Sequence, residues 1–464
     1  MTAERGLPGL GLADRRSRAV GAVMLVAAVA AAAVVGRWSL PVLAGLGVLA
    51  VLGFLLSRLP LVVAALAAGF YFNAYLSHGA GLITIDKGIG ALAVVAWGLE
   101  WAVSRRPIIV TRQMWLLGAF LLWTFVSLTV AVNEKAALVT TLRYVIFATL
   151  FFLVVQTVHG DRRRAGVLVH IVVAAAAVAA VIGLVAFLRH QVVQASGPLK
   201  DPNDFGFLLA STLPLAVYET RWAATRWARV LADLAMAVIG VCTLATFSRS
   251  ALTGLAVAVV WALVTGRLRL RWLVVGLACA VVVVSLALVL TPQQVTSALT
   301  QRAHVASANV SERLGYYRVE LNEWDHYPVT GVGPGNFVYR FYQFAPAVGE
   351  SLPYPSNVLT ISGEDAYLVI LAEQGVVGLT LFLGYLALSW AGLRRRFPGD
   401  ERSDQLQTAL AAGFVVACVG ALFLAEQYYP PLWFLPALGA ALAGDPRQPM
   451  AGRPMAAGRM AGQP

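Results

Sequence analysis

Near its start the chain carries Arg15-Arg16-Ser17-Arg18 followed by AVGAVMLVAAVAAAAVVG, an apolar run that covers residues 19–36. The run holds no charged residue and comes close to the roughly 20 apolar residues that a helix needs to cross about 30 Å of hydrocarbon. Basic residues before an apolar run are also typical of a secretory signal peptide, but this run is longer than a usual signal core and further apolar runs follow it at once. We therefore predict that residues 19–36 form a first, retained transmembrane helix.

Similar apolar runs recur along the whole chain. Of its 464 residues, 59% are hydrophobic and only 12% are charged, whereas a soluble globular protein carries roughly 25% charged residues. The composition therefore argues against an ordinary soluble protein and predicts an all-α polytopic membrane protein with about fourteen transmembrane helices. The expected spans are 19–36, 39–57, 59–77, 88–104, 113–132, 137–158, 165–188, 205–219, 230–247, 250–266, 272–291, 366–390, 408–426 and 429–444.

The basic residues are distributed unevenly among the connections between these spans. Clusters such as Arg162-Arg163-Arg164 and Arg394-Arg395-Arg396 alternate with connections that carry few positive charges. Lys and Arg are enriched in the cytoplasmic loops of membrane proteins. The pattern predicts cytoplasmic N- and C-termini. It also attributes the net charge of +12 to topology and to contact with anionic membrane lipids, so no nucleic-acid partner is expected.

This threading divides the chain into four parts. Residues 1–291 hold transmembrane helices 1–11, and residues 292–365 form one large extracytoplasmic loop with short helices. Residues 366–444 hold transmembrane helices 12–14, and residues 445–464 form a cytoplasmic tail. The tail is predicted to be disordered because it is rich in Gly, Pro, Met and Arg and lacks apolar periodicity.

One short helix of the large loop is expected to begin at Ser311, which would cap it. The residues that follow helical spacing on one face are Leu314, Tyr317, Leu321 and Trp324. Such a pattern is typical of an amphipathic helix. This helix would lie on the outer membrane surface or cover a cavity.

The loop offers little support for a bound cofactor. The run Gly331-Val332-Gly333-Pro334-Gly335 lacks the preceding strand and the Gly-Lys-Ser/Thr ending of a phosphate-binding loop, so we expect tight turns there and no nucleotide. His304 and His326 have no second ligand at a recognisable metal spacing, and the three cysteines lie inside apolar runs. No metal site is therefore predicted.

Two arginines lie where lipid makes a charge costly, at about 2.5–3.5 kcal/mol for the centre of a helix on insertion scales. Arg143 lies inside the span 137–158. It either forms an ion pair, with Glu134 or with an acidic residue of another helix, or binds an anion. Arg249 lies at the outer junction of two spans with almost no loop between them. It serves either as an anchor at the membrane interface or as an anion ligand, and the sequence leaves these alternatives open.

Two outer segments carry carboxylates. The stretch Asp201-Pro202-Asn203-Asp204-Phe205 suits a turn that leads into a helix, with Asn203 or Asp204 as the N-cap. Glu364 and Asp365 precede the span 366–390. They either favour the positive end of the helix dipole, or supply a general base at the membrane surface.

In their order and on their side of the membrane, these pieces resemble the O-antigen ligase/O-antigen polymerase superfamily of bacterial membrane glycosyltransferases. The resemblance covers roughly residues 190–390. It is carried by Asp201-Pro202-Asn203-Asp204-Phe205, Ser248-Arg249-Ser250, Arg313, Trp324, Pro328, Gly331-Val332-Gly333-Pro334-Gly335-Asn336-Phe337, Tyr367-Leu368 and Ala372-Glu373-Gln374-Gly375-Val376-Val377-Gly378-Leu379. It implies a GT-C-like helical fold in the bacterial inner membrane. It also implies transfer of a polyprenyl-diphosphate-linked saccharide to a glycan or lipid-glycan acceptor outside the cytoplasm, without a metal or another cofactor.

In this superfamily, arginines of the outer face hold the donor diphosphate. Guanidinium groups match phosphate oxygens in a bidentate way, and fixed cations in a partly dry site stabilise the charge of a leaving diphosphate. The arginines carried over are Arg249 and Arg313 first, then Arg318, Arg143 and Arg189. The residues carried over as substrate-binding are Asn203, Asp204 and Tyr367.

The sequence departs from the ligases at one place. Where the ligases carry a His-Asn pair with a catalytic His, this chain reads Glu364-Asp365. A carboxylate also accepts a proton from a sugar hydroxyl, and base catalysis typically contributes about 10²–10⁴-fold. We therefore assign Glu364 as the base, with Asp365 as second choice. The departure disfavours a strict lipid A-core ligase and leaves a polysaccharide polymerase or a ligase with another acceptor, while a transporter or flippase of lipid-linked oligosaccharide is the alternative class.

Overall fold

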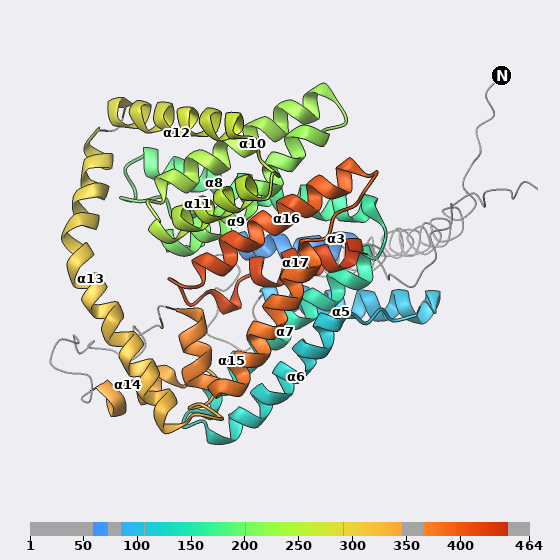
Figure 1. Ribbon diagram of the computed structural model, residues 1–464, viewed down its shortest axis with the longest axis vertical. Coiled ribbons are helices and arrows are strands. Elements are labelled where there is room, and N and C mark those ends of the chain that lie inside the picture. The colour runs from blue at the N-terminus through green and yellow to red at the C-terminus, as the bar shows by residue number, and fades with distance from the viewer. Residues whose placement is uncertain are drawn as a thin grey trace, which may run out of the picture.

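The computed structural model describes residues 59–72, 85–105, 107–199, 201–290, 292–345, 363 and 365–443. Within these ranges the chain forms helices joined by short connections, and no strand occurs there. Figure 1 shows most of the helices packed together, with α13 running along one edge and α12 along another. The all-α class is confirmed for this part of the chain.

Each span expected between residues 59 and 444 coincides with a helix. The α-helices at these spans are α3 (Leu59–Gly69), α5 (Ile85–Ser104), α6 (Arg112–Ser127), α7 (Glu134–Val158), α8 (Arg162–Leu188), α9 (Pro202–Trp222), α10 (Arg226–Ala245), α11 (Arg249–Val264), α12 (Leu270–Leu290), α15 (Ala366–Leu393), α16 (Glu401–Gly420) and α17 (Pro431–Ala443). Short 3₁₀ turns are η1 (Phe70–Phe72), η2 (Leu128–Val130), η3 (Gly197–Leu199) and η6 (Glu426–Tyr428). The spans expected at 19–36 and 39–57, and the tail 445–464, lie outside the described residues.

Length and composition mark several of the described helices as able to cross a membrane. Five stretches qualify in full: Arg112–Val130, Glu134–Val158, Arg162–Leu188, Arg226–Ala245 and Ala366–Leu393. Four shorter apolar helices are Leu59–Phe72, Gly88–Ser104, Arg249–Val264 and Pro431–Ala443. The chain is thus a polytopic α-helical membrane protein, whereas the count of about fourteen spans and the GT-C-like topology stay predictions.

Small residues allow α9 to pack closely against its neighbours at the end where it begins. A Cβ on Gly206 would lie 2.8 Å from the Ser248 Cβ, and a Cβ on Gly420 would lie 2.5 Å from the Phe207 ring. Close backbone approach at small residues is the usual way for membrane helices to associate. The first turn of α9 therefore lies between the start of α11 and the end of α16.

The segment expected to be a loop with short helices contains one long helix. Helix α13 (Pro292–His326) runs for 35 residues, and only α14 (Phe337–Phe344) is short. The prediction that a helix begins at Ser311 is therefore wrong. Leu314 and Leu321 of the predicted apolar face are exposed, so contact of that face with the membrane surface stays a prediction. The buried face of α13 carries Tyr316, Val319, Glu320 and Glu323.

Helix α15 is broken at Gly375, whose backbone has φ 67° and ψ −172°. This conformation is accessible to glycine and strongly disfavoured for other residues. The break opens space for the turn that follows α13. A Cβ on Gly375 would lie 2.0 Å from the Val329 carbonyl oxygen, and a Cβ on Gly331 would lie 2.3 Å from the Glu373 carbonyl carbon. The two glycines thus allow the turn and the broken helix to touch backbone to backbone.

The turn at residues 328–336 satisfies the backbone groups that the break leaves without helical partners. The Val332 and Gly333 N–H groups donate to the Ala372 and Glu373 carbonyl oxygens, each at 2.9 Å. The Val376 N–H donates to the Pro328 carbonyl oxygen, also at 2.9 Å. Helix α6 contributes as well: the Trp123 Nε1–H donates to the Gln374 carbonyl oxygen at 2.8 Å, and the Ser127 hydroxyl donates to the Glu373 carbonyl oxygen at 3.0 Å. The glycine run predicted as tight turns therefore holds the two halves of α15 through backbone hydrogen bonds. We call this contact the clamp.

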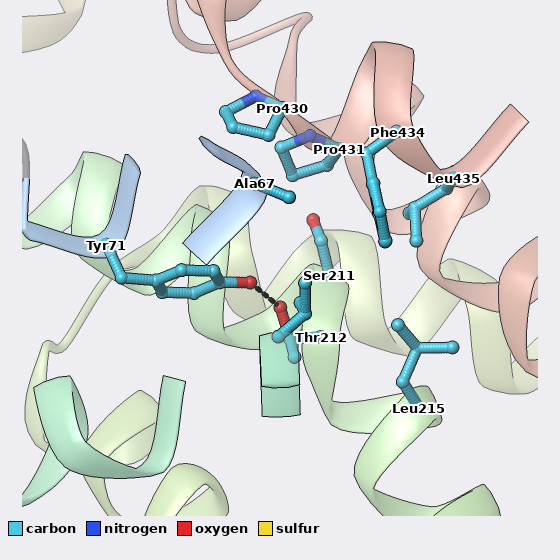
Figure 2. Close-up of a pocket in the computed structure, with 10 residues that line it drawn as sticks. Ala67, Tyr71, Ser211, Thr212, Leu215, Pro430, Pro431, Phe434 and Leu435 are labelled. Atoms are coloured by element: carbon cyan, nitrogen blue, oxygen red, sulfur yellow. Dashed lines mark hydrogen bonds between the residues drawn. The ribbon is translucent and has the colours of Figure 1, made fainter. Parts of the chain in front are cut away.

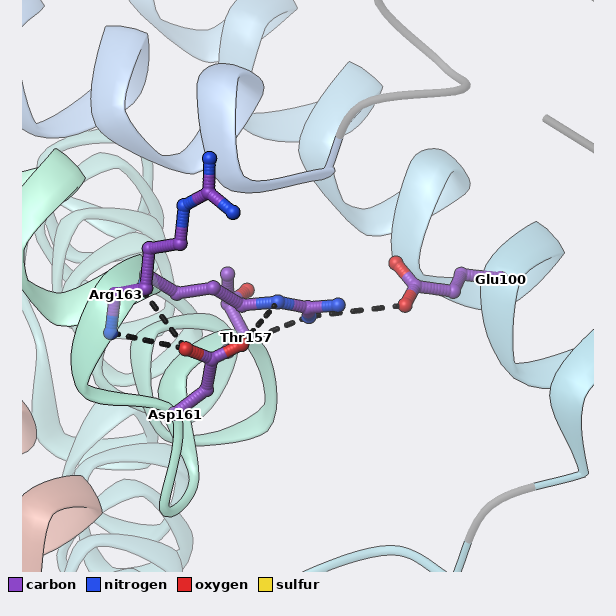
Figure 3. A network of polar contacts seen from close by, with 5 residues as sticks. Glu100, Thr157, Asp161 and Arg163 are labelled. Carbon is purple, nitrogen blue, oxygen red and sulfur yellow. Dashed lines mark hydrogen bonds and ion pairs between the residues drawn. The ribbon is translucent and has the colours of Figure 1, made fainter. Parts of the chain in front are cut away.

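Charged groups pair around the start of α8 (Figure 3). The Arg164 guanidinium lies 3.2 Å from the Asp161 carboxylate, 3.9 Å from the Glu100 carboxylate and 3.0 Å from the Thr157 carbonyl oxygen. Arg162 forms an ion pair with Asp400 in the connection between α15 and α16. Arg162 and Arg164, which the sequence pattern assigns to the cytoplasm, thus pair with acidic groups, while the side of the membrane that they face stays a prediction.

We expect the substitution Gly375→Ala to destabilise the protein by about 3 kcal/mol or more, because it adds backbone strain and a direct clash with the Val329 carbonyl. The measurement is the apparent thermal midpoint of the purified protein in detergent. Gly384→Ala is the matched control in the same helix, since its Cβ would meet only Leu116 Cδ1 at 3.5 Å. Equal midpoints for the two variants would contradict the role of the break.

Candidate functional site

Several residues that the sequence singled out meet at one short segment. We define the α16–α17 connection as residues 418–430, which comprise the last turn of α16 and the chain leading to α17. Its contacts come from α7, α9, α13 and α15, which are far apart in the sequence. The predicted site residues that contact it are Arg143, Asp204, Arg313 and Tyr367.

The stretch around Asp204 is organised by a cap. Asp201 Oδ1 accepts from the Asn203 N–H at 2.6 Å and from the Asp204 N–H at 3.2 Å, so Asp201 is the N-cap of α9. The prediction of Asn203 or Asp204 as the cap is wrong. Pro202 occupies the first helical position, where proline is favoured because its missing N–H costs nothing, and the cap is then the residue before it.

The Asp204 carboxylate makes a contact across the bundle. The Tyr429 hydroxyl donates to Asp204 Oδ2 at 2.5 Å. The Tyr429 ring also packs edge-on against Phe207, one turn further along α9, with 6.1 Å between the ring centroids. Asp204 is therefore held in a defined orientation by the α16–α17 connection.

Arg143 extends from α7 to the neighbouring residue of the same connection. Its guanidinium carbon lies 5.6 Å from the centroid of the Tyr428 ring, within the range of a cation–π contact. The ring of Tyr428 in turn packs against Tyr144 at 4.9 Å between centroids. Arg143 also interacts electrostatically with Glu373 at the break in α15. Of the alternatives for Arg143, the structure thus shows a charged partner on another helix, and its exposed side chain is compatible with an anion as well.

Arg313 joins the same region from α13. Its Nη1–H donates to the Phe423 carbonyl oxygen at 3.2 Å. Arg318, little more than one helical turn further along, is exposed. The two arginines therefore differ in exposure, and of the two only Arg313 has a described contact with the α16–α17 connection.

Arg249 and Arg189 lie at the ends of their helices. Arg249 is the exposed first residue of α11, after Ser248, whose hydroxyl accepts from the Ala251 N–H at 3.4 Å. Because the start of α11 packs on the first turn of α9, Arg249 belongs to the same end of the bundle as Asp204. Arg189 is the exposed C-cap of α8. That end of α8 packs beside the start of α11 through the rings of Phe187 and Phe247, 6.4 Å apart.

The carboxylate and the tyrosine that open α15 both have structural partners. Asp365 Oδ1 accepts from the Tyr367 N–H at 2.7 Å and from the Leu368 N–H at 2.9 Å, so Asp365 caps the helix. Burial raises the pKa of Asp365, and these two hydrogen bonds oppose the rise. The Tyr367 hydroxyl donates to the Cys418 carbonyl oxygen at 2.8 Å. Glu364 lies outside the described residues, and its assignment as the base stays a prediction.

A buried acidic cluster lies between α13 and α15. Glu320, Glu323 and Glu373 are 1%, 0% and 3% exposed. The Gly335 and Phe337 N–H groups donate to the Glu373 carboxylate. A Cβ on Gly363 would lie 3.1 Å from Glu320 Oε1, so this cluster adjoins Gly363.

Glu323 is the most isolated member of the cluster. Neither carboxylate oxygen has a hydrogen-bond partner among the residues that the structure describes. Burial, reinforced by the charge of Glu373 and opposed by Arg340, raises the pKa of Glu323 to about 10. Glu323 is therefore protonated and neutral at physiological pH. Arg340 itself donates to the Tyr327 hydroxyl at 2.7 Å and lies over the Tyr327 ring.

A separate apolar pocket lies between α3, α8, α9 and α17 (Figure 2). Tyr71 and Thr212 share a hydrogen bond inside it, and Phe434 and Leu435 supply much of its apolar wall. None of the predicted site residues lines it. We therefore assign no part of the proposed chemistry to this pocket.

The sequence analysis did not single out Tyr428, Tyr429, Glu323 or Glu320 as site residues. A signal was available for the two tyrosines, because a Tyr-Tyr pair stands where one expected span ends and the next begins, at the end of the bundle that carries the other candidates. No local signal marks Glu320 or Glu323, because carboxylates on a helix outside the membrane are ordinarily solvated. Within the described ranges, no group of three or more His, Cys, Asp or Glu side chains has an arrangement that could hold a metal ion.

Comparison with known proteins places part of this structure in a family. Residues 234–383 match the family model described as O-antigen ligase. The matched segment runs from α10 to α15 and includes Arg249, Arg313, Arg318, Glu364 and Asp365. No curated protein matches the chain.

We expect the stability of the protein to fall as pH rises between about 5 and 9, with Glu323 as one cause. Its pKa is 4.5 as the reference value and about 10 in the fold, so in this window the folded state binds a proton that the unfolded state has lost. Such a group contributes a slope of at most about 1.4 kcal/mol per pH unit. Glu323→Gln, which mimics the neutral acid, should therefore flatten the dependence of the thermal midpoint on pH. Asp325→Asn, exposed on the same helix, is the control that should leave the dependence as in the wild type.

Proposed function

We propose that this chain is a membrane glycosyltransferase of the O-antigen ligase/O-antigen polymerase superfamily, a membership that the family match at residues 234–383 supports, and that it transfers or polymerises a polyprenyl-diphosphate-linked saccharide at the extracytoplasmic face. The donor is a polyprenyl-diphosphate-linked glycan, and the acceptor is a glycan or a lipid-linked glycan. The observation that carries the proposal is the meeting of Arg143, Asp204, Arg313 and Tyr367 at the α16–α17 connection.

The arginines suit a reaction whose leaving group is a diphosphate. In the transfer, an acceptor hydroxyl attacks the anomeric carbon, the bond from that carbon to the diphosphate oxygen breaks, and negative charge develops on the diphosphate. Fixed guanidinium groups at hydrogen-bond distance stabilise that charge without reorganisation. Arg313 and Arg249 are proposed as the principal ligands of the diphosphate, with Arg143, Arg189 and Arg318 as further cations at the same end of the bundle.

The proton of the attacking hydroxyl needs an acceptor. We assign this role to Glu364, with Asp365 as the second choice. The capping hydrogen bonds of Asp365 occupy one carboxylate oxygen, and this supports Glu364 as the first choice. Asn203, Asp204 and Tyr367 are proposed to contact the glycan, since carboxylate, amide and hydroxyl groups pair with sugar hydroxyls.

The proposal is tested with the purified full-length protein in detergent, a synthetic polyprenyl-diphosphate-linked oligosaccharide and an unlabelled acceptor glycan. We expect new glycosidic bonds to form in the presence of a chelator and without ATP or an ion gradient. Movement of the lipid-linked oligosaccharide across reconstituted vesicles, without formation of any glycosidic bond, would instead indicate a flippase.

In this assay we expect Glu364→Gln to lower the turnover number by about 10²–10⁴-fold, because the amide cannot accept the proton. The protein should remain folded and membrane-inserted, as judged by its thermal midpoint and its elution in size-exclusion chromatography. Full transfer by a folded Glu364→Gln variant would remove Glu364 from the mechanism. Loss of activity in Asp365→Asn alone would move the base to Asp365.

We expect Arg313→Gln and Arg249→Gln each to lower kcat/KM for the donor by about 10- to 100-fold, since a hydrogen bond to a charged group is worth about 1.5–3 kcal/mol. Arg163→Gln is the matched control, because this exposed arginine belongs to the cluster where α8 begins, at the other end of that helix from Arg189. A loss of the same size in Arg163→Gln would indicate a general effect of charge. Wild-type kinetics in both test variants would exclude these arginines as diphosphate ligands.

A further inference from the structure

Two consecutive tyrosines of the α16–α17 connection contact proposed substrate residues from α7 and α9. We propose that Tyr428 and Tyr429 are positioning residues for the glycosyl donor: Tyr429 orients the Asp204 carboxylate toward the sugar, and Tyr428 orients the Arg143 guanidinium toward the diphosphate. This inference rests on the proposed function and deepens it. Both tyrosines lie outside residues 234–383, which the family match covers.

The contact of Tyr429 with Asp204 is short and directional. The donor and acceptor are separated by 225 positions in the sequence and by 2.5 Å in space. A hydrogen bond to an ionised carboxylate is roughly twice as strong as one between neutral groups. With Oδ2 held by Tyr429, the orientation of the carboxylate plane is restricted, and with it the direction in which Oδ1 is presented.

Tyr428 restricts the side chain of Arg143, which could otherwise adopt many rotamers. Arg143 is exposed, and a free arginine loses up to about 2 kcal/mol of rotamer entropy when it binds a ligand. A ring at 5.6 Å from the guanidinium carbon limits the accessible orientations before any substrate arrives. The Tyr428 ring is itself fixed by Tyr144, which is fully buried.

The turn that presents the two tyrosines is held in place from α17. The Trp433 Nε1–H donates to the Gln427 carbonyl oxygen at 2.9 Å. The Trp433 and Phe434 N–H groups donate to the Pro430 carbonyl oxygen at 2.9 Å and 2.7 Å. Because one short turn carries both side chains, it sets the spacing between a group for the sugar and a group for the diphosphate. A glycosyl diphosphate carries both chemistries, a sugar next to a diphosphate, and is the class of ligand that such a pair of groups would bind.

The test uses the glycan-transfer assay with full-length variants. Tyr429→Phe removes only the hydroxyl and keeps the ring on Phe207, and we expect it to raise KM for the donor about tenfold. Tyr428→Leu removes the ring, and we expect a rise in KM of about fivefold that Tyr428→Phe largely restores. For both variants kcat should change less than twofold. Tyr385→Phe, which removes a buried hydroxyl that donates to the Leu432 carbonyl, is the control and should leave KM unchanged.

Double mutants separate positioning from a general loss of structure. If Tyr429 acts through Asp204, Tyr429→Phe has no further effect on KM in an Asp204→Ala background, and likewise Tyr428→Leu has none in an Arg143→Gln background. Additive losses in both pairs would overturn the inference, as would a wild-type KM in Tyr429→Phe and Tyr428→Leu. If Tyr428→Leu does not fold, Tyr429→Phe decides alone. Absence of glycan transfer by the wild-type protein would instead overturn the proposed function.

Discussion

A helix that breaks inside a membrane-spanning bundle exposes carbonyl and N–H groups that lipid cannot satisfy. In this chain α15 breaks at Gly375, and its exposed backbone groups need hydrogen-bond partners. The turn at residues 328–336 supplies them with three backbone hydrogen bonds. The contact is possible because Gly331 and Gly375 have no side chain where the two backbones touch. This clamp fixes α13, which precedes the turn, against α15. Asp365 and Arg313 are consequently parts of one structural unit.

The α16–α17 connection extends this unit to the rest of the bundle. It receives the Arg313 guanidinium from α13 and the Tyr367 hydroxyl from α15, and it holds Asp204 of α9. Each contact uses a carbonyl oxygen or a tyrosine hydroxyl, groups that keep their position because the turn is short and hydrogen-bonded to α17. Rigid placement of cations is what the proposed stabilisation of a leaving diphosphate requires, because the groups do not reorganise during the reaction.

The buried carboxylates of α13 show where pattern reasoning fails near a membrane. Apolar residues at helical spacing marked an amphipathic face with Leu314 and Leu321; those two residues are exposed, whereas Glu320 and Glu323 of the same helix are buried. Amphipathic patterns assign the apolar face to the interior on the assumption that water lies outside. Near a bilayer the outside is partly apolar, while an interior that binds polar groups accepts carboxylates, especially protonated ones such as Glu323. The cap of α9 is a different kind of miss, since the proline at the first helical position already pointed to Asp201.

Local properties were readable from the chain without any structure. Apolar runs placed the helices, because the cost of putting a backbone in lipid is met within each helix by its own hydrogen bonds. The order of short motifs between 201 and 379 showed a resemblance to the superfamily, and the match at residues 234–383 supports it. Which polar groups meet was decided only by the tertiary structure. Asp204 and Tyr429, or Arg143 and Tyr428, lie on helices whose packing depends on small residues throughout the bundle, and no single segment encodes their contact.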